Sequence, residues 1–504
     1  MRDPAPWQKR YGRLLLLSIL FGVVSQYLFI DKMPGISVVV TVAGFYGIYA
    51  YAIRGRLGGF DKWRGQSLAS WALLPVIALL ALTYVLYDNR LFAFLNLFAL
   101  LLLVLGQTVI MTRTSTNPWY RWPFLQELVS QSVAKPLRYL NVPFRMIKEL
   151  FPSGNGKHSE RESNWGKIRQ GLLGLLLALP ILFVVVALLA SADSIFQSWV
   201  SEVPQWLSGI SIGDGIARIA AGSFIALYTF CYIWGLLFPL IKERADAALE
   251  YSASDADPVI NLSMSPITAA VLLVSVNSVY VLFAAIQFSY LFGAADGMLP
   301  TGVAYAEYAR RGFAELVLVA LINIVLLLGG LRLIEAGGRA AELLRKLLLS
   351  MLVGCTLVML VSAYSRLSLY EHAYGYTQSR LLVHGFMLYL AVLLLIALCR
   401  IWKERFSLAK ATVCISVAAY LIMNYANIDA RIALNNIQRF EETGVIDIPY
   451  LSRLSVDALP AIAELQSRHP ELLTLQPVLK RMRTASSDEH TWASWNLSRW
   501  KAHR

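Results

Sequence analysis

The sequence predicts an all-α, polytopic transmembrane helical bundle of about eleven spans, followed by a small helical C-terminal region on the extracytoplasmic side. Composition and the length of the apolar runs predict this fold class. Of the 504 residues, 57% are hydrophobic and only 15% are charged, and the mean hydropathy is +0.55. Soluble proteins carry about 25% charged residues, so an ordinary cytosolic enzyme is excluded. Many apolar runs also reach the roughly 20 residues that a membrane-spanning helix needs.

Eleven apolar runs are interpreted as transmembrane helices because each is long enough to cross the hydrocarbon layer. They cover residues 14–30, 35–53, 70–87, 91–111, 170–191, 216–241, 266–293, 313–334, 343–364, 381–399 and 408–427. The tail that follows is less hydrophobic and has an amphipathic pattern. This pattern predicts helices near residues 432–440, 449–465 and 471–482.

The distribution of basic residues sets the expected orientation. If the N-terminus with Arg2, Lys9, Arg10 and Arg13 is cytoplasmic, the cytoplasmic segments hold 28 of the 45 Lys and Arg residues, the outer loops seven and the tail ten. This asymmetry is the one that the positive-inside rule describes. The net charge of +13 is therefore interpreted as a topology signal with attraction to anionic lipid, and nucleic acid is not an expected partner.

Four parts are expected along the chain. Residues 1–111 form a four-span unit, and residues 112–167 form a cytoplasmic amphipathic insertion and linker. Residues 168–427 form a seven-span core, and residues 428–504 form a helical cap on the extracytoplasmic side. Aromatic and basic residues within 118–150 predict helices on the inner membrane surface. A small soluble helical hairpin is the alternative for that segment.

The chain carries little recognisable chemistry. It has no GxxxxGK[ST], HExxH or GxSxG motif, so no cofactor is expected and no catalytic residue is assigned. The cysteines Cys231, Cys355, Cys399 and Cys414 form no CxxC pair, and no metal site is expected. His384 lies in an apolar span, where a hydrogen bond to a neighbouring helix is favoured over a role as metal ligand.

Two outer segments, residues 305–315 and 364–380, are dense in charge and tyrosine. The candidate outer polar cluster is Tyr305, Glu307, Arg310, Arg311, Glu315, Arg366, Glu371, His372 and Arg380. The residues expected to converge are Glu307, Arg310, Arg311, Arg366, Glu371 and Arg380. Charges near hydrocarbon pair with one another or face a cavity. An excess of arginine over carboxylate favours an anionic ligand. The alternative is an interfacial belt of tyrosine and arginine with local ion pairs.

Several separate stretches resemble an uncharacterised bacterial membrane family, domain of unknown function 4173, which is related to number 4153. The stretches are residues 189–196, 305–315, 370–377, 424–439, 450–461 and 495–499, and they occur in the family's order. The resemblance covers roughly residues 170–500, and the first four spans carry no matching motif. It implies a bacterial cytoplasmic-membrane protein without assigned activity, and it transfers no catalytic residue.

Three function classes follow. The first is a signalling or ligand-sensing protein, with an anionic small molecule or lipid at the outer face and a membrane protein as partners beside the bilayer. The second is an outward-facing enzyme acting on a lipid-linked saccharide or phosphate, suggested by Glu371 next to His372 in an outer loop. The third is a transporter, which the lack of internal repeats disfavours.

Overall fold

The computed structural model describes residues 12–54, 67–150, 213–238, 264–293, 313–335, 338–403, 406–487 and 491–503. Within these residues the chain is helical, and its only β feature is an isolated bridge between Met264 and Ile334. The predicted all-α fold is therefore confirmed.

Nine helices of the described residues are long and apolar enough to cross a membrane. They are α1 (Gly12–Phe29), α2 (Ile36–Ile53), α3 (Leu68–Leu86), α4 (Arg90–Thr112), α10 (Gly213–Leu237), α12 (Pro266–Gly293), α15 (Arg339–Tyr374), α16 (Gln378–Trp402) and α17 (Leu408–Tyr425). Each coincides with a predicted span. A further predicted span is helix α14 (Phe313–Arg332), whose apolar part is shorter, and the span at 170–191 lies outside the described residues.

Large apolar side chains remain on the outside of these helices. Leu97, Val271 and Leu388 are each about 60% exposed (63%, 62% and 58%). In water this arrangement would be costly, whereas hydrocarbon removes the cost. A helix also satisfies its own backbone hydrogen bonds, which lipid cannot do. The exposed apolar faces thus agree with helices that lie in a bilayer.

The chain forms two compact units. Unit 1 comprises Met1–Pro75, Leu101–Ala245 and Thr491–Ser494. Its core contains Phe230 and Tyr232 of α10, both essentially inaccessible to solvent. Helices α1 and α10 approach so closely that a Cβ on Gly22 would lie 2.2 Å from the carbonyl oxygen of Gly222. Small residues at helix contacts permit such packing in membranes.

The insertion after α4 folds as short helices in unit 1: α5 (Trp122–Val129), α6 (Lys135–Arg138) and α7 (Asn141–Leu150). It contacts α10 directly, because the Tyr228 hydroxyl donates to the Ser132 carbonyl at 3.1 Å and the Tyr139 hydroxyl donates to the Phe238 carbonyl. The insertion is therefore anchored to a membrane-spanning helix. Its location on the inner leaflet stays a prediction.

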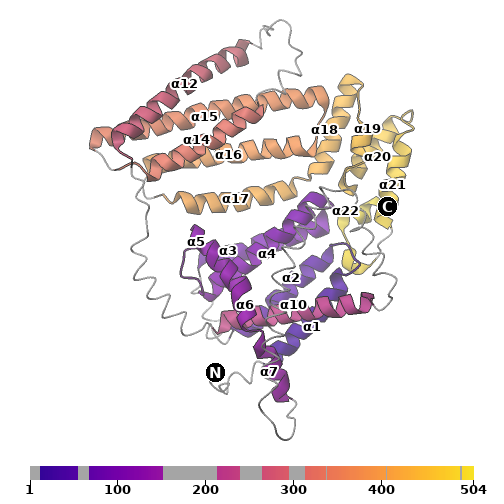
Figure 1. Cartoon of the computed structure of the whole chain (residues 1–504). Helices are drawn as coiled ribbons and strands as arrows, with labels where there is room; N and C mark the ends of the chain where they lie inside the picture. The colour runs from indigo at the N-terminus through magenta and orange to yellow at the C-terminus, as the bar shows by residue number, and fades with distance from the viewer. Residues whose placement is uncertain are drawn as a thin grey trace, which may run out of the picture. The chain divides into compact units, whose positions relative to one another are not determined.

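Unit 2 comprises Val76–Leu100, Asp246–His490 and Trp495–Arg504. Helix α15 packs against α12, α14 and α16, and α17 lies beside α16 (Figure 1). Most of the core between them is apolar, with a few polar bonds: Asn323 Nδ2 donates to Thr356 Oγ1 at 2.9 Å, and Asn277 Nδ2 donates to the Leu348 carbonyl at 2.9 Å. Such bonds hold helices together where no water competes.

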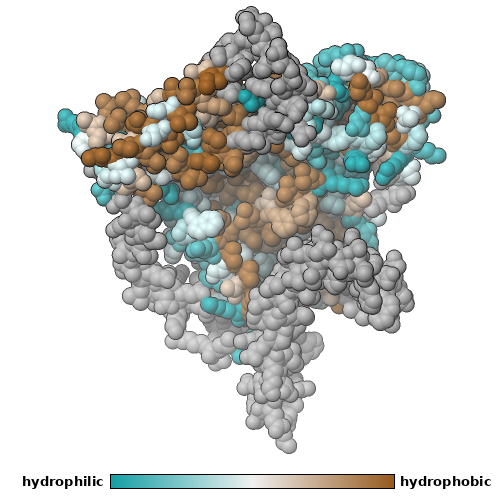
Figure 2. Space-filling view, turned by 45° about the horizontal axis from the view of Figure 1, so that its top comes forward, coloured by the Kyte–Doolittle hydropathy of each residue, from teal (hydrophilic) through white to brown (hydrophobic). Residues whose placement is uncertain are grey.

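The C-terminal residues of unit 2 form a helical region at one end of these helices (Figure 1). It contains α18 (Ile428–Thr443), α19 (Ile448–Leu451), a 3₁₀ turn (Val456–Ala458), α20 (Leu459–Arg468), α21 (Leu475–Ser487) and α22 (Leu497–Ala502). Its own apolar core includes Ile462 and Leu475, both 0% exposed. Figure 2 shows hydrophilic side chains over much of this region and hydrophobic ones over α12 and α15.

Candidate functional site

The structure describes part of the predicted outer polar cluster. Tyr305, Glu307, Arg310 and Arg311 lie outside the described residues, and Glu315 lies in the first turn of α14, where side chains are not described. Arg366, Glu371 and His372 lie on the last turns of α15, and Arg380 lies on the first turn of α16. The convergence of the six charged residues therefore stays a prediction.

Glu371 and His384 form a buried acid–base pair between α15 and α16, which we call the helix-end pair. Glu371 is 2% exposed, and its Oε2 lies 3.3 Å from Nδ1 of His384. On the other side of the ring, Nε2 of His384 lies 3.3 Å from Oγ of Ser368 and 3.4 Å from the carbonyl of Tyr364. His384 thus contacts the neighbouring helix, as the sequence favoured.

The second carboxylate oxygen of Glu371, Oε1, is buried and has no hydrogen-bond partner among the described residues. A buried polar atom left in this way costs free energy, and the cost is larger for a carboxylate than for a neutral group. The sequence drew attention to Glu371 because His372 follows it. Adjacent helical residues point about 100° apart, so His372 is exposed and lies by the ring of Tyr376.

Arg380 lies against an aromatic ring. Its guanidinium is 4.3 Å from the centre of the Tyr370 ring, and Nη1 donates to the Gly375 carbonyl. No described carboxylate lies within 4 Å of it. Cation–π contact of this kind leaves the remaining donors of an arginine available for an anion.

The turn after α15 is bound to α18. Arg439 donates from Nε to the His372 carbonyl and from Nη2 to the Ala373 carbonyl, both at 2.7 Å. Asn436 accepts from the Tyr376 amide at 2.8 Å and donates to its carbonyl at 2.9 Å. These bonds satisfy carbonyl groups at a helix C-terminus that have no partner within the helix. The helix-end pair and the C-terminal region are therefore connected through only a few residues.

A second polar cluster, which sequence reasoning did not assemble, joins the α3–α4 turn to the C-terminal region. We call it the junction site. Asp88 accepts from Nε and Nη2 of Arg499 at 2.8 and 2.5 Å, and the Asp88 amide donates to Oδ2 of Asp457 at 2.9 Å. Asp429, at the start of α18, accepts from the Ser455 amide at 3.2 Å. Asp429 and Asp457 are 5% and 6% exposed.

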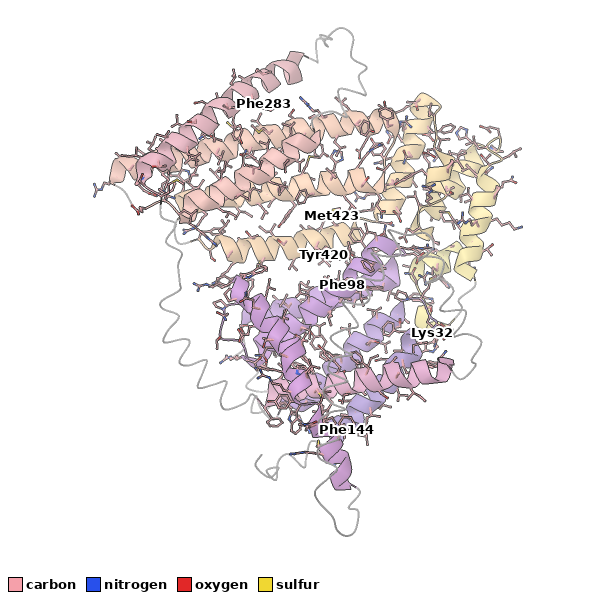
Figure 3. The ribbon with its side chains drawn as sticks, viewed as in Figure 1. Lys32, Phe98, Phe144, Phe283, Tyr420 and Met423 are labelled. Carbon is pink, nitrogen blue, oxygen red and sulfur yellow. The ribbon has the colours of Figure 1, made fainter. Side chains whose placement is uncertain are left out.

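Asparagines continue the junction site toward the membrane-spanning helices. Asn96 of α4 donates to Oδ1 of Asn424 at 2.6 Å and accepts from the hydroxyl of Tyr420 at 2.6 Å. Figure 3 shows Tyr420 on α17. Asn496 donates to the carbonyls of Tyr84 and Tyr87, both at 2.8 Å. The side-chain amide of Asn496 thus satisfies backbone groups at the end of α3, where the helix itself offers no partner.

The carboxyl group of Asp457 is perturbed by its surroundings. Burial raises its pKa to about 6, hydrogen bonds from Ser498 and the Asp88 amide oppose the rise, and the nearby charges of Asp88 and Asp429 add to it. Burial also raises the pKa of Tyr87, with a further contribution from Asp457. A carboxyl group with a pKa near 6 changes charge within the physiological range.

The junction site gathers motifs that the sequence shows only as separate pieces. Residues 424–439, 450–461 and 495–499 were each recognised, and they supply Asn424, Asp457 and Arg499. Their partners Asp88, in the α3–α4 turn, and Asn96, in α4, lie in the predicted four-span unit, where no motif was matched. The order of the family motifs was the available signal, but order along the chain does not specify contact.

Exposed apolar helices and a C-terminal helical region bound at their ends define an all-α, multi-pass membrane protein. Over residues 74–465 the chain matches the family described as domain of unknown function (DUF4153), and it belongs to that family. The match begins within α3, well before the range on which the resemblance rested, so it includes the α3–α4 part of the junction site. The resemblance to the related family, domain of unknown function 4173, stays a prediction.

No protein among the curated sequences matches the chain. No solved structure matches it either.

Proposed function

We propose that this protein is a sensory or regulatory protein of the bacterial cytoplasmic membrane, with a cytoplasmic N-terminus and its C-terminal helical region outside. The α3–α4 turn, the α15–α16 turn and the C-terminal region lie at one end of unit 2. The positive-inside argument assigns all three to the outer side. The signal would be an anionic small molecule or lipid headgroup at that face, and the C-terminal region would pass it to a membrane-protein partner.

One observation carries this proposal: an incompletely bonded buried carboxylate lies within five residues of the contacts that dock the C-terminal region. Glu371 has an unpartnered oxygen, and the Tyr376 amide and carbonyl bind Asn436 of α18. A change of charge or ligand at Glu371 therefore acts next to Gly375, the point where the chain turns. Regulatory devices commonly consist of such a local electrostatic change beside an element with two arrangements.

The proposal is tested with the full chain in nanodiscs that contain anionic lipid, by hydrogen exchange of residues 372–378 and 428–443. Glu371→Gln removes the charge and keeps the shape. Faster exchange is expected in both segments because a weaker contact with His384 loosens the end of α15, whose carbonyl groups bind Arg439 of α18. Glu342→Gln at the other end of α15, where Arg345 pairs with Glu342 in the same helix, is the matched control and should leave both segments unchanged.

A ligand arm uses inorganic phosphate as the probe. If Arg380 takes part in anion binding, phosphate slows exchange at 372–378 in the wild type and has no effect in Arg380→Gln. If exchange in both segments is unchanged in Glu371→Gln, the proposal is overturned.

The remaining function classes are separated in cells. Deletion of the gene should change a defined set of transcripts, and Glu371→Gln expressed at normal level should reproduce that change. Accumulation of a lipid-linked saccharide without a transcript response would favour the membrane enzyme. Loss of uptake of a solute would favour the transporter.

A further inference from the structure

A pocket lies between α12, the end of α14 and the start of α15 in unit 2, which we call the α12–α15 pocket. It is at the opposite end of α15 from the helix-end pair. Its volume is about 300 Å³, and its walls are residues within 266–273 of α12, Ile334 and Glu335 after α14, and residues within 341–348 of α15. Small-molecule pockets measure about 300–1,000 Å³, so this one has room for part of a ligand such as a hydrocarbon chain.

Backbone and side-chain bonds hold the walls of this pocket together. The Met264 amide donates to the Leu333 carbonyl at 2.8 Å, and the Glu335 amide donates to the Met264 carbonyl at 3.2 Å. These two bonds hold the start of α12 beside the end of α14. Arg345 of α15 donates from Nη1 to the Gly330 carbonyl at 3.1 Å, which connects α15 to α14. The pocket is therefore built by three connected helices.

The α12–α15 pocket opens on the apolar outside of these helices. Among its lining residues, Ile267, Val271 and Leu344 are 77%, 62% and 44% exposed, whereas Leu273 and Leu348 are buried. Exposed apolar side chains on a membrane-spanning helix lie against lipid, because water would make their exposure costly. An occupant can therefore enter the pocket directly from the bilayer.

The depth of the pocket matches a single leaflet. Residues 266–273 and 341–348 each rise about 10 Å along their helix, and both ranges lie near the start of that helix. The hydrocarbon core of a bilayer is about 30 Å thick, so the pocket covers about a third of it from one side. The positive-inside argument assigns this end to the cytoplasmic leaflet. The acyl chain of a phospholipid in that leaflet has the matching location and chemistry.

Three charged side chains line the pocket, namely Glu335, Glu342 and Arg345. Arg345 donates from Nε to Oε2 of Glu342 at 2.9 Å and from Nη2 to Oε1, so these two residues neutralise each other, and Lys346 lies 3.8 Å from the same carboxylate. Glu335 is exposed, and among the residues that the structure describes no basic side chain lies within 4 Å of its carboxylate. Charge complementarity therefore favours a cationic group beside Glu335.

We propose that the α12–α15 pocket binds a phospholipid with a primary-amine headgroup. One acyl chain fills the apolar part between α12 and α15, and the headgroup ammonium lies beside Glu335. Arg332 at the end of α14 and Arg339 at the start of α15 are exposed at the same end of the helices, and they give the lipid phosphate basic neighbours. A lipid without the amine would leave Glu335 without a cation. This site is separate from the outer face and does not depend on the proposed function.

The first test locates the lipid with the full chain in nanodiscs that contain phosphatidylethanolamine and phosphatidylglycerol. A phosphatidylethanolamine analogue carries a diazirine near the carboxyl end of one acyl chain, and mass spectrometry locates the crosslinks. Labelling of residues 266–273 and 341–348 is expected to be severalfold stronger than that of α17, which is less buried than α12 and reports ordinary contact with the bilayer. Labelling no stronger than that of α17 overturns the proposal.

A steric variant tests occupation of the pocket itself. Ala341→Phe places a ring among the lining residues and should reduce labelling to the level of α17. Ala340→Phe is the matched control, because Ala340 is exposed, does not line the pocket and points about 100° away from Ala341. It should leave labelling unchanged. Equal labelling in the two variants contradicts the proposal.

The headgroup is tested with the same diazirine on phosphatidylglycerol. In the wild type the amine lipid is expected to label the pocket severalfold more strongly, and Glu335→Gln should remove this difference. Glu335 is exposed, so this variant leaves the packing of the helices intact. Equal labelling by the two lipids in the wild type, or a preference that Glu335→Gln retains, overturns the proposal.

Discussion

The helix-end pair and the junction site are both buried and polar, but the chain assembles them differently. The helix-end pair is built from two consecutive helices, and Glu371 and His384 are separated by one turn between them. The junction site joins Asp88 to Arg499 across most of the sequence. Each site has one buried carboxylate oxygen without a partner among the described residues, Oε1 of Glu371 and Oδ1 of Asp457, but only the junction site also pairs an aspartate, Asp88, with a guanidinium in two hydrogen bonds. The comparison indicates a responsive site beside a stabilising one.

Replacing the arginine of each site should give the largest difference. Arg499→Ala leaves the half-buried Asp88, whose side chain is 15% exposed, without its cation and two hydrogen bonds, so a loss of about 3 kcal/mol is expected. Arg439→Ala leaves carbonyl groups at an exposed helix end that water reaches, so about 1 kcal/mol is expected. The free energies of unfolding of the two variants in detergent measure this difference. Equal losses would show that the junction site is no more important for stability than the helix end.

The pH dependence of stability tests Asp457 within the junction site. Its pKa is about 6 in the folded protein and near 3.8 when unfolded. Between these values the folded chain binds more protons, so the free energy of unfolding falls as the pH rises from about 4 to 6, by up to about 3 kcal/mol. Asp457→Asn should abolish this fall. If the variant keeps the wild-type slope, another group is responsible.

The turn beside the helix-end pair provides a smaller effect. Gly375 has φ +88°, and a Cβ there would lie 2.8 Å from Oδ1 of Asn436. Gly375→Ala is therefore expected to cost about 2 kcal/mol through strain and the displaced Asn436. Gly444→Ala, at φ +72° in open space, is expected to cost only about 1 kcal/mol, from backbone strain alone. Urea unfolding measures the loss of stability in both variants, and the difference between the two losses is the steric contribution of Asn436. Equal losses would show that there is no such contribution.

The smallest effect is expected at Ser368. Its hydroxyl lies 3.3 Å from Nε2 of His384, a long contact, and it also donates to the Tyr364 carbonyl at 3.0 Å within its own helix. Ser368→Ala should therefore cost less than about 1 kcal/mol. A larger loss in thermal unfolding would mean that Ser368 holds His384 in place, and that the helix-end pair is as rigid as the junction site.

Local pattern was sufficient to predict the helices. The length and composition of an apolar run determine whether it spans a bilayer, because lipid satisfies no backbone hydrogen bond. The helix at residues 432–440 was likewise predicted from its apolar spacing and is part of α18. The same spacing did not predict which of these apolar side chains are buried: Leu434 is 53% exposed, whereas Ile432 is 0% exposed. Which face of a helix is covered depends on its neighbours.

The sequence by itself thus determined the fold class, nine of the spanning helices and the presence of charge around residues 364–380. Only the tertiary structure decided which charges meet. Glu371 faces His384 instead of its neighbour His372 because helical geometry turns adjacent side chains apart. Asp88, Asp457 and Arg499 meet because the C-terminal region folds back on the α3–α4 turn. Contacts between distant segments depend on packing of the whole unit, and no local pattern of residues encodes them.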